Sequence, residues 1–453
     1  MGSVVDGQTV NAGRVLLLLF LANLLNFFDR TIPAVVIEPL RKEYALSDLQ
    51  LGLVSAAFTL IYAVAGIPLG KLADTGSRRK VLGWGLLVWS GFTGLNALAW
   101  NYWSFFLLRL GVGVGEASYA PAASSLISDL YPANRRARAT GIYMLGLPVG
   151  LMLAFFTVGG MVTAFGSWRA PFLIAAVPGM VLALFMFFIR EPERGASEEA
   201  RISQQPVAQP IRTLLRIRTL TWLTLSGVTL NFATYAGNGF LVPLLQRYFE
   251  LPLVQAAVVT GFITGVTGLV GLTLGGWVAD RAHARSERGR LTFGTLSLLV
   301  GAVGTGLALL SGKASVPLFA VCFGLGWLGL YNYYTSVYPA IQDVVEPRLR
   351  AQAMALFFAG MYVLGGALGP AVVGGLSDVF TVSAMREAGA VEVTEAFKAT
   401  GLHSAMFLIP VMLLLTAVFM HLASRSFVAD ARRMRESLAR VEVDGARGLR
   451  EVA

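Results

Sequence analysis

Arg109 and Glu116 stand seven residues apart in an apolar segment that carries no other charge near them. Seven residues are about two turns of an α-helix, so the two side chains would share one face and lie roughly 10 Å apart along the axis. Ionisable groups at membrane depth face the protein interior or a wet cavity, where they mark the paths of ions and substrates. If this segment crosses a membrane, we expect it to form a wall of a translocation cavity, with glycines 111, 113 and 115 keeping that wall thin.

Asp29 and Arg30 form a second pair of charges, in the apolar segment 15–36. At about 1.5 Å per residue, Asp29 would lie roughly 21 Å from one membrane face and Arg109 roughly 9 Å from the other, which is a similar depth in a core about 30 Å thick. Asp29 can therefore pair with Arg109. Because adjacent helical residues point about 100° apart, Arg30 would instead reach Glu116 or a substrate.

These four charges suggest two roles. Burial disfavours a charged carboxylate and a nearby guanidinium favours it, so Asp29 and Glu116 are candidate proton-coupling groups. Arg30 and Arg109 are candidate ligands for an anionic substrate. The alternative is a permanent buried salt bridge that only fixes the packing of two helices.

The composition agrees with a membrane setting for these charges. Of the 453 residues, 55% are hydrophobic and only 14% are charged, and the mean hydropathy is +0.66. Soluble domains are nearer 45–50% apolar, and a membrane span needs about 20 mostly apolar residues. The chain offers twelve such segments: 15–36, 49–73, 81–100, 103–130, 137–165, 170–189, 220–248, 256–279, 291–310, 316–341, 351–376 and 401–423.

The chain divides into two similar halves. The polar stretch 191–218 separates them, so we predict a six-helix bundle over 1–190, a linker over 191–218, a second six-helix bundle over 219–425 and a tail over 426–453. Asp74 after the second span recurs 206 positions later as Asp280 after the eighth. Two halves with matching signals indicate a duplicated transporter with its site at their interface.

Basic residues set the expected orientation. With the N-terminus inside, 27 of the 36 Lys and Arg residues fall on the cytoplasmic side, as basic residues in membrane proteins do. We therefore expect both termini in the cytoplasm and the protein in the inner membrane. The net charge of +10 follows from this topology and does not indicate a nucleic-acid partner. Glu38 and Asp48, which flank the first outer loop, are expected to be solvated.

The remaining composition excludes other chemistry. Cys322 is the single cysteine, so no disulfide can form within the chain, and the three histidines are too scattered for a metal site. No pairing of a nucleophile with a base is evident. We expect no enzymatic activity and no cofactor.

The seventh and tenth spans carry aromatic and amide side chains in place of charges. A cavity with one charged wall and one aromatic, weakly polar wall suits a substrate with an ionic head and an apolar body. The alternative for each tyrosine is a place in helix packing or at the membrane interface. The candidate residues are Asn231, Tyr235, Asn238, Tyr331 and Tyr334.

The stretch Gly70-Lys71-Leu72-Ala73-Asp74-Thr75-Gly76-Ser77-Arg78-Arg79-Lys80 resembles the motif between the second and third spans of the major facilitator superfamily, departing from it at Thr75. Phe28-Asp29-Arg30, and Arg109 followed by Gly113-x-Gly115-Glu116-Ala117, resemble the Spinster family of lysolipid and sphingolipid transporters. The resemblance implies an all-α membrane protein with twelve transmembrane helices in two pseudo-symmetric six-helix bundles, working by alternating access.

The same resemblance implies a cytoplasmic gate in which Asp74, Arg78 and Arg79 contact the region of the eleventh span around Asp378. The alternative is that the basic residues only anchor the helix ends at the lipid surface. The full set of expected gating residues is Gly70, Asp74, Arg78, Arg79, Arg138, Asp280, Arg281 and Asp378.

From these observations we expect a monomeric, proton-coupled secondary transporter for an amphipathic anion or zwitterion, such as a lysophospholipid or a sphingoid phosphate. Its partners would be that substrate, protons and the lipid bilayer, with no nucleic acid. One alternative is a carrier for small organic anions or drugs. Another is a sensor that binds its ligand without translocation.

Overall fold

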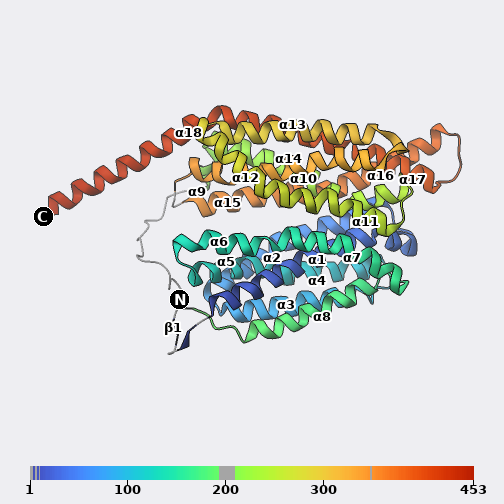
Figure 1. Ribbon diagram of the computed structural model, residues 1–453, viewed down its shortest axis with the longest axis horizontal. Coiled ribbons are helices and arrows are strands. Elements are labelled where there is room, and N and C mark those ends of the chain that lie inside the picture. The colour runs from blue at the N-terminus through green and yellow to red at the C-terminus, as the bar shows by residue number, and fades with distance from the viewer. Residues whose placement is uncertain (1–3, 6–7, 10, 193–209, 347–348, 453) are drawn as a thin grey trace. The chain divides into compact units, whose positions relative to one another are not determined.

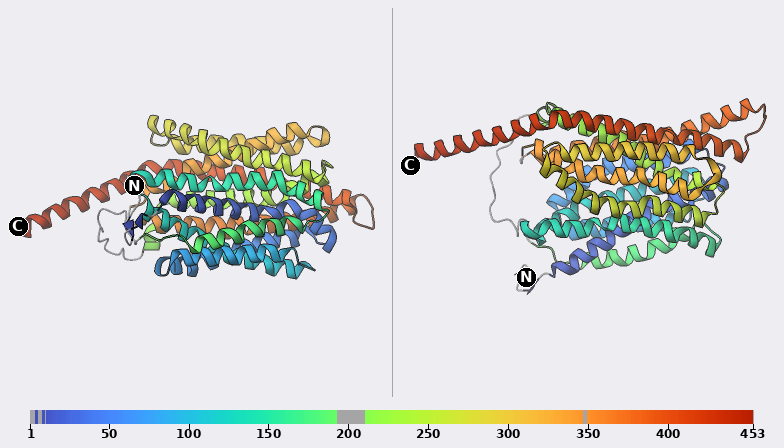
Figure 2. Two further views of the ribbon diagram at one scale, coloured as in Figure 1. Left: turned by 60° about the horizontal axis from the view of Figure 1, so that its bottom comes forward. Right: turned by 45° about the horizontal axis from the view of Figure 1, so that its top comes forward.

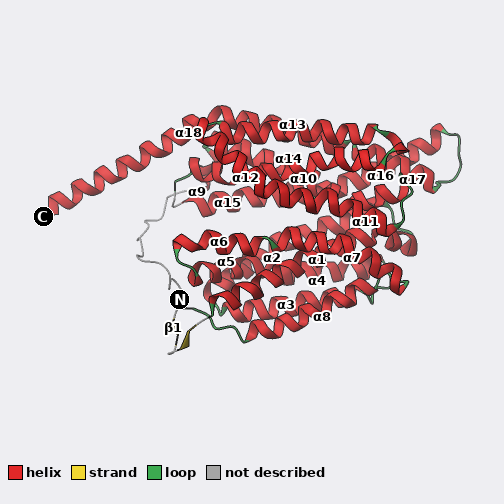
Figure 3. Ribbon diagram, viewed as in Figure 1, coloured by secondary structure: helices red, strands yellow, loops and turns green. Residues whose placement is uncertain are grey.

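The computed structural model describes residues 4–5, 8–9, 11–192, 210–346 and 349–452, and they are almost entirely helical (Figures 1 and 3). The short strands β1 (Val4–Val5) and β2 (Gln8–Thr9) pair antiparallel, with Val4 opposite Thr9. The helical fold confirms the predicted all-α class, and the count of twelve spans stays a prediction. Among the described residues, nine helices are long and apolar enough to cross a membrane.

The first of two compact units holds the whole first half of the sequence and parts of the second, namely residues 1–202, 236–266 and 370–405. Its long helices run alongside one another in every view (Figure 2). Those from the first half are α1 (Ala12–Tyr44), α2 (Asp48–Thr75), α3 (Arg78–Asn96), α4 (Tyr102–Ala117), α5 (Tyr119–Leu130), α6 (Ala133–Met144), α7 (Gly146–Phe165) and α8 (Ala170–Phe187).

The second half of the sequence is shared between the units. The second unit comprises residues 203–235, 267–369 and 406–453. The boundaries between the two units therefore fall inside two long helical segments, 218–247 and 350–387, and each segment contributes residues to both units. The predicted domain boundaries remain a prediction. The elements are α9 (Pro210–Leu215), α10 (Arg218–Arg247), α11 (Leu253–Gly261), η1 (Phe262–Val266), α12 (Thr267–Arg285), α13 (Gly289–Leu310), η2 (Gly312–Ala314), α14 (Val316–Val344), α15 (Arg350–Ala359), η4 (Gly360–Gly366), α16 (Leu368–Glu387), α17 (Glu395–Met406) and α18 (Leu408–Val452).

Three of the predicted spans form helices that are too short or too polar to count as candidate spans by length and composition alone. They are α3, the pair α4 and α5, and α10. The predicted segment 103–130 is not one uninterrupted helix, because Ser118 separates α4 from α5. Segments 256–279 and 351–376 each contain a π-helical stretch, η1 and η4. Such stretches within α-helices are frequent at functional sites.

Local sequence explains where the helices of the first unit begin. The Ser47 hydroxyl accepts a hydrogen bond from the backbone N–H of Gln50, whose side-chain oxygen accepts one from the backbone N–H of Ser47, and this capping box starts α2. Asn101 and Ser104 form the same arrangement at the start of α4. Each box satisfies backbone N–H groups that the first turn of a helix would otherwise leave unpaired.

Glycines of α4 allow its neighbours to approach closely. A Cβ atom at Gly115 would lie 2.6 Å from the backbone nitrogen of Trp89 on α3. A Cβ atom at Gly113 would lie 2.6 Å from Cγ2 of Ile61 on α2. Both distances are too short for a real Cβ contact, so the predicted thin face of α4 is what lets α2 and α3 pack beside Arg109 and Glu116.

Candidate functional site

Asp29 and Arg30 on α1 and Arg109 and Glu116 on α4 all lie within the first unit. We call these four residues the central cluster. Asp29, Arg109 and Glu116 are buried, with exposed fractions of 0%, 3% and 1%. Charges buried to this degree are costly unless they are paired or hydrogen-bonded, so the contacts of each one matter.

Arg30 pairs with Glu116, one of the two partners expected for it. Its Nε atom donates a hydrogen bond to Oε2 of Glu116 at 2.5 Å. The Glu116 side chain is fully buried, whereas that of Arg30 is 15% exposed. Arg30 is therefore the member of the pair that the surroundings can reach.

Asp29 does not form the predicted direct pair with Arg109. Among the described residues no ion pair joins them, and Oδ2 of Asp29 instead accepts a hydrogen bond at 3.3 Å from the Thr93 hydroxyl on α3. The prediction was wrong because depth alone does not determine which neighbouring helix a side chain faces. The charges of Asp29, Arg109 and Glu116 still lie close enough to interact electrostatically.

Several buried polar atoms of this region form no hydrogen bond of good geometry within the described part of the protein, although Asn26 lies close enough to interact with Glu116, and Trp89 with Asp29. They are Oδ1 of Asp29, Nη1 of Arg109, Oε1 of Glu116, Nδ2 of Asn26 and Nε1 of Trp89. Nearly all buried polar atoms in native proteins have a partner. A group of such atoms around two carboxylates and a guanidinium can therefore accept a proton, water or a polar ligand.

Aromatic rings surround the two arginines, and sequence reasoning missed them. The guanidinium carbon of Arg30 lies 4.3 Å from the ring centroid of Tyr62 and 5.4 Å from that of Phe58. The guanidinium carbon of Arg109 lies 4.8 Å from the Phe58 ring centroid. All of these distances are within the range of cation–π attraction.

The second unit brings together two of its predicted residues, Asn231 and Tyr334. The Tyr334 hydroxyl donates to Oδ1 of Asn231 at 3.4 Å, and Nδ2 of Asn231 donates to the Met361 carbonyl at 3.1 Å. Tyr235 packs edge-on against Tyr362, with ring centroids 6.2 Å apart. These contacts are aromatic and polar, and they involve no charged side chain.

Tyr331 and Asn238 do not belong to that arrangement. Tyr331 packs against α12, where a Cβ atom at Gly271 would lie 2.6 Å from its own Cβ atom, so its contact is that of close helix packing. Asn238 lies in the part of α10 that belongs to the first unit.

Arg78, predicted as a gating residue, is buried at the start of α3. It forms an ion pair with Asp129, its Nη1 donates to the Ser125 hydroxyl at 3.2 Å, and its Nη2 donates to the Pro192 carbonyl at 2.7 Å. With 1% of its side chain exposed, Arg78 is not a lipid-surface anchor. Arg79 is exposed, and its backbone N–H donates to Glu191.

The second half repeats this ion pair. Arg290 follows Arg78 by 212 positions, and Asp343 follows Asp129 by 214. Arg290 contacts Asp343 at 3.3 Å and Asp280 at 3.0 Å. The internal repeat inferred from the sequence therefore extends to side-chain contacts, each within its own unit.

For the other predicted gating residues the structure defines fewer side-chain contacts. Arg281 lies over the Trp277 ring at 4.0 Å, Arg138 is exposed, and Gly70 has room for a Cβ atom 3.8 Å from Pro121. The side chain of Asp74 lies outside the described residues. Their role in gating remains a prediction.

Asp378 corrects the predicted gate. Its two carboxylate oxygens accept hydrogen bonds from the backbone N–H groups of Asp48 and Leu49, at 3.0 and 2.9 Å. These groups form the first turn of α2, whereas Asp74 lies near the end of that 28-residue helix. Asp378 therefore caps the far end of α2 from Asp74 and cannot contact it.

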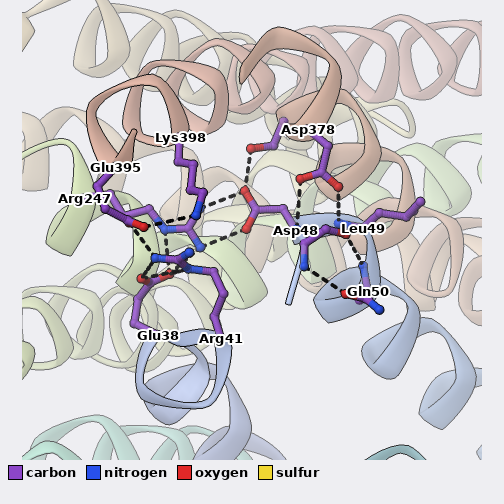
Figure 4. Close-up of polar contacts among 11 residues, drawn as sticks. Glu38, Arg41, Asp48, Leu49, Gln50, Arg247, Asp378, Glu395 and Lys398 are labelled. Carbon is purple, nitrogen blue, oxygen red and sulfur yellow. Dashed lines mark hydrogen bonds and ion pairs between the residues drawn. The ribbon is translucent and has the colours of Figure 1, made fainter. Parts of the chain in front are cut away.

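A second group of buried charges surrounds this capped end, where α1 leads into α2 (Figure 4). We call Glu38, Arg41, Asp48 and Arg247 the hairpin cluster. Their side chains are 4–5% exposed, so the expectation that Glu38 and Asp48 are solvated is wrong. Arg247, the last residue of α10, pairs with both carboxylates.

Further contacts tie the hairpin cluster to α16 and α17. The Ser377 hydroxyl donates to Oδ2 of Asp48 at 2.6 Å. Arg41 contacts Glu38 and, through Nη2, Oε2 of Glu395 at 2.6 Å (Figure 4). All of these residues belong to the first unit, so the cluster joins the ends of α1 and α2 to segments from the second half of the sequence.

Comparison with known proteins agrees with this arrangement. The family model of the Major Facilitator Superfamily matches residues 19–370. The chain is 26% identical to Sphingosine-1-phosphate transporter SPNS2 of Xenopus tropicalis over 438 residues, covering 93% of this chain and 83% of that one. It is 30% identical to Protein spinster homolog 3 of Mus musculus over 389 residues, covering 81% and 75%.

Among solved structures, the chain is similar to a bacterial homolog of the human lysosomal transporter Spinster in an inward-facing and unoccupied conformation. The TM-score is 0.82 at 28% identity, and the match covers 92% of this chain and 98% of that one. The match to the family model over residues 19–370 includes the four residues of the central cluster and both repeats of the arginine–aspartate pair. The chain belongs to the Spinster family of the major facilitator superfamily, whose fold is that of a multi-pass membrane transporter.

Proposed function

We propose that this protein is a proton-coupled secondary transporter that moves an amphipathic anion or zwitterion, such as a lysophospholipid or sphingoid phosphate, by alternating access. We place it in the inner membrane with both termini in the cytoplasm. The observation that carries the proposal is the buried contact of Arg30 with Glu116, beside Asp29 and Arg109. A sphingosine-1-phosphate transporter among the relatives supports the substrate class.

Arg30 and Arg109 supply the anion-binding chemistry. A guanidinium presents several N–H donors in a planar fork that matches phosphate and carboxylate groups. Arg109 keeps one buried Nη1 atom without a partner among the described residues, and Arg30 is partly exposed. An anionic head group that bound Arg30 would compete with Glu116 for the same guanidinium.

That competition provides a route to proton coupling. Breaking a buried ion pair leaves an uncompensated charge, which is strongly unfavourable. Glu116 would avoid this cost by taking up a proton when Arg30 turns to the substrate. Asp29, which is fully buried and has Thr93 as its hydrogen-bond donor, is the second group that can exchange a proton.

Asn231, Tyr235 and Tyr334 would contact the less polar part of the substrate. Tyrosine offers an apolar ring together with one polar tip, which suits the region where a lipid head group meets its chain. Asn231 and Tyr334 are already joined by a hydrogen bond. Loss of the Tyr334 ring should therefore weaken binding of long-chain substrates more than of short-chain ones.

Transport by the purified protein in vesicles tests the proposal. With a proton gradient, wild type should accumulate labelled lysophospholipid, and Asp29→Asn and Glu116→Gln should lose the response to the gradient. Arg109→Ala should lose binding of the anionic substrate. Glu43→Gln is the matched control, since Glu43 is a half-exposed carboxylate of α1 that pairs with Arg169.

Two outcomes would contradict the proposal. Gradient-driven uptake that is undiminished in both carboxylate variants would remove Asp29 and Glu116 as coupling groups. Saturable binding without counterflow of labelled substrate would indicate a sensor instead of a carrier. Counterflow of small organic anions but not of lysophospholipids would favour the alternative function, that of a carrier for small organic anions or drugs.

A further inference from the structure

Phe58 on α2 lies between the two arginines of the central cluster. Its ring centroid is 5.4 Å from the guanidinium carbon of Arg30 and 4.8 Å from that of Arg109. The ring is 7% exposed, so both contacts are largely shielded from water. Cation–π attraction is stronger at such desolvated sites than at exposed ones.

The sequence places the ring there through a glycine. A Cβ atom at Gly113 would lie 3.3 Å from both the carbonyl oxygen and Cδ2 of Phe58. Gly113 therefore lets α2 approach α4 at the level between Arg109 and Glu116. Any larger residue at this position would push α2, and Phe58 with it, away from Arg109.

Tyr62 continues the aromatic surface one turn along α2. Residues four apart on a helix are neighbours on one face, and the rings of Phe58 and Tyr62 stack with centroids 6.5 Å apart and an interplanar angle of 22°. The guanidinium carbon of Arg30 lies 4.3 Å from the Tyr62 centroid. Arg30 thus lies over the rings of Phe58 and Tyr62, and also over that of Phe27 at 5.4 Å, and Phe58 is the ring that it shares with Arg109.

The ring has different importance for the two arginines. Arg30 has Glu116 as a direct ion partner. Arg109 forms no ion pair within the described part of the chain, and the Phe58 ring adds a cation–π contact to the longer-range attraction of Glu116 and Asp29. Without that ring, Arg109 would keep only the longer-range attraction of Asp29 and Glu116, and Glu116 is already paired with Arg30.

We propose that Phe58, with Tyr62, is a positioning residue that holds Arg30 and Arg109 where one multi-oxygen anionic head group can contact both. The proposal rests on the proposed function and narrows it to phosphate-bearing substrates, because a phosphate presents several acceptor oxygens to two guanidinium groups at once. The ring keeps Arg109 available by attracting it without occupying its N–H donors.

Stepwise fluorination of residue 58 provides a direct test, since it weakens the negative ring face while changing the ring size little. The proteins to compare are wild type, variants with mono-, di- or trifluorinated phenylalanine at position 58, and Phe58→Leu. For each protein we measure the affinity for lysophosphatidic acid and for uncharged monoacylglycerol. We expect affinity for lysophosphatidic acid to fall progressively, by about tenfold overall. Monoacylglycerol binding should stay constant, and Phe58→Tyr should retain wild-type affinity.

Phe172→Leu is the matched control, because Phe172 is also a buried ring of the first unit and packs on Phe105 and Trp168 instead of on the two arginines. It should leave the ratio of the two affinities unchanged. Fluorinated variants that bind lysophosphatidic acid as tightly as wild type would overturn the positioning role. A wild-type protein that binds monoacylglycerol and lysophosphatidic acid equally would instead overturn the proposed function on which it rests.

Discussion

Arg247 holds Asp48 through two parallel hydrogen bonds, from Nη1 to Oδ2 and from Nη2 to Oδ1, each 2.8 Å long. Its Nε atom also donates to Oε1 of Glu38 at 2.6 Å. One guanidinium from the end of α10 therefore pairs with two carboxylates at the turn between α1 and α2, and Arg41 supplies a second positive charge to Glu38. The side chains of Arg247, Asp48 and Glu38 are 4–5% exposed.

We expect Arg247→Met to destabilise the protein strongly. Removing one partner of a buried ion pair leaves uncompensated charge and typically costs about 3–5 kcal/mol, and here two carboxylates lose the same partner. Denaturant unfolding in detergent micelles measures the effect. Lys398→Met is the control, because Lys398 and its partner Glu395 are 33% and 58% exposed, and exposed pairs contribute about 0–1 kcal/mol. Equal losses in the two variants would contradict the structure of the hairpin cluster.

The central cluster could be predicted in part, and the hairpin cluster could not. Arg30 and Glu116 are isolated charges in apolar segments, and their depth and face limit the expected partners of Arg30 to Glu116 or a substrate. Glu38 and Asp48 stand at helix ends, where charges are usually solvated, and their partner Arg247 is about 200 positions away in the chain. Nothing in the local sequence points to it.

The sequence contains a signal that places Asp378 correctly, at the opposite end of α2 from Asp74. Successive spans run in alternate directions, so the end of the eleventh span lies at the same end of the bundle as the start of the second. Asp378 follows the eleventh predicted span directly and therefore belongs beside Asp48, where the structure places it. Phe58 had no comparable signal, because one phenylalanine in an apolar span cannot be distinguished from the others by type or spacing.

The repeated arginine–aspartate pairs should differ in their importance for stability. Arg78 is 1% and Asp129 10% exposed, whereas Arg290 is 12% and Asp343 41% exposed. We expect Arg78→Gln to cost about 3–5 kcal/mol and Arg290→Gln about 1 kcal/mol or less. Unfolding of both variants under the same conditions gives the comparison. A larger loss at Arg290 would show that burial does not govern these two sites.

Gly115→Ala should be destabilising although alanine is the better helix former. The new Cβ atom would lie 2.6 Å from the Trp89 nitrogen, which is backbone and cannot move aside alone. Overpacking of this kind typically costs about 1–3 kcal/mol. Gly91→Ala on α3 is the control, since a Cβ atom there meets nothing within 4 Å, and it should be neutral or stabilising by up to about 1 kcal/mol. The same unfolding assay separates the two, and a neutral Gly115→Ala would mean that α3 and α4 are further apart than described.

The contact of Glu287 with Arg435 makes the attachment of α18 sensitive to acid and salt. Arg435 on α18 donates to Oε1 of Glu287, between α12 and α13, at 3.0 Å, and this hydrogen bond lowers the pKa of Glu287 from its ordinary value. A carboxylate whose pKa is lowered by folding stabilises the contact above its unfolded pKa. That contribution is lost as the pH falls through the lowered value.

We therefore expect the contact to persist from pH 7 to 5 and to weaken only below the ordinary pKa of glutamate. A spin label on a cysteine at Ser286, in a Cys322→Ser background, should gain mobility in that acid range. Added salt should produce the same gain at neutral pH, because exposed charges are screened. Glu287→Gln removes the ionised acceptor and should leave the label mobile at every pH. A label whose mobility follows the pH equally in Glu287→Gln would assign the transition to another group.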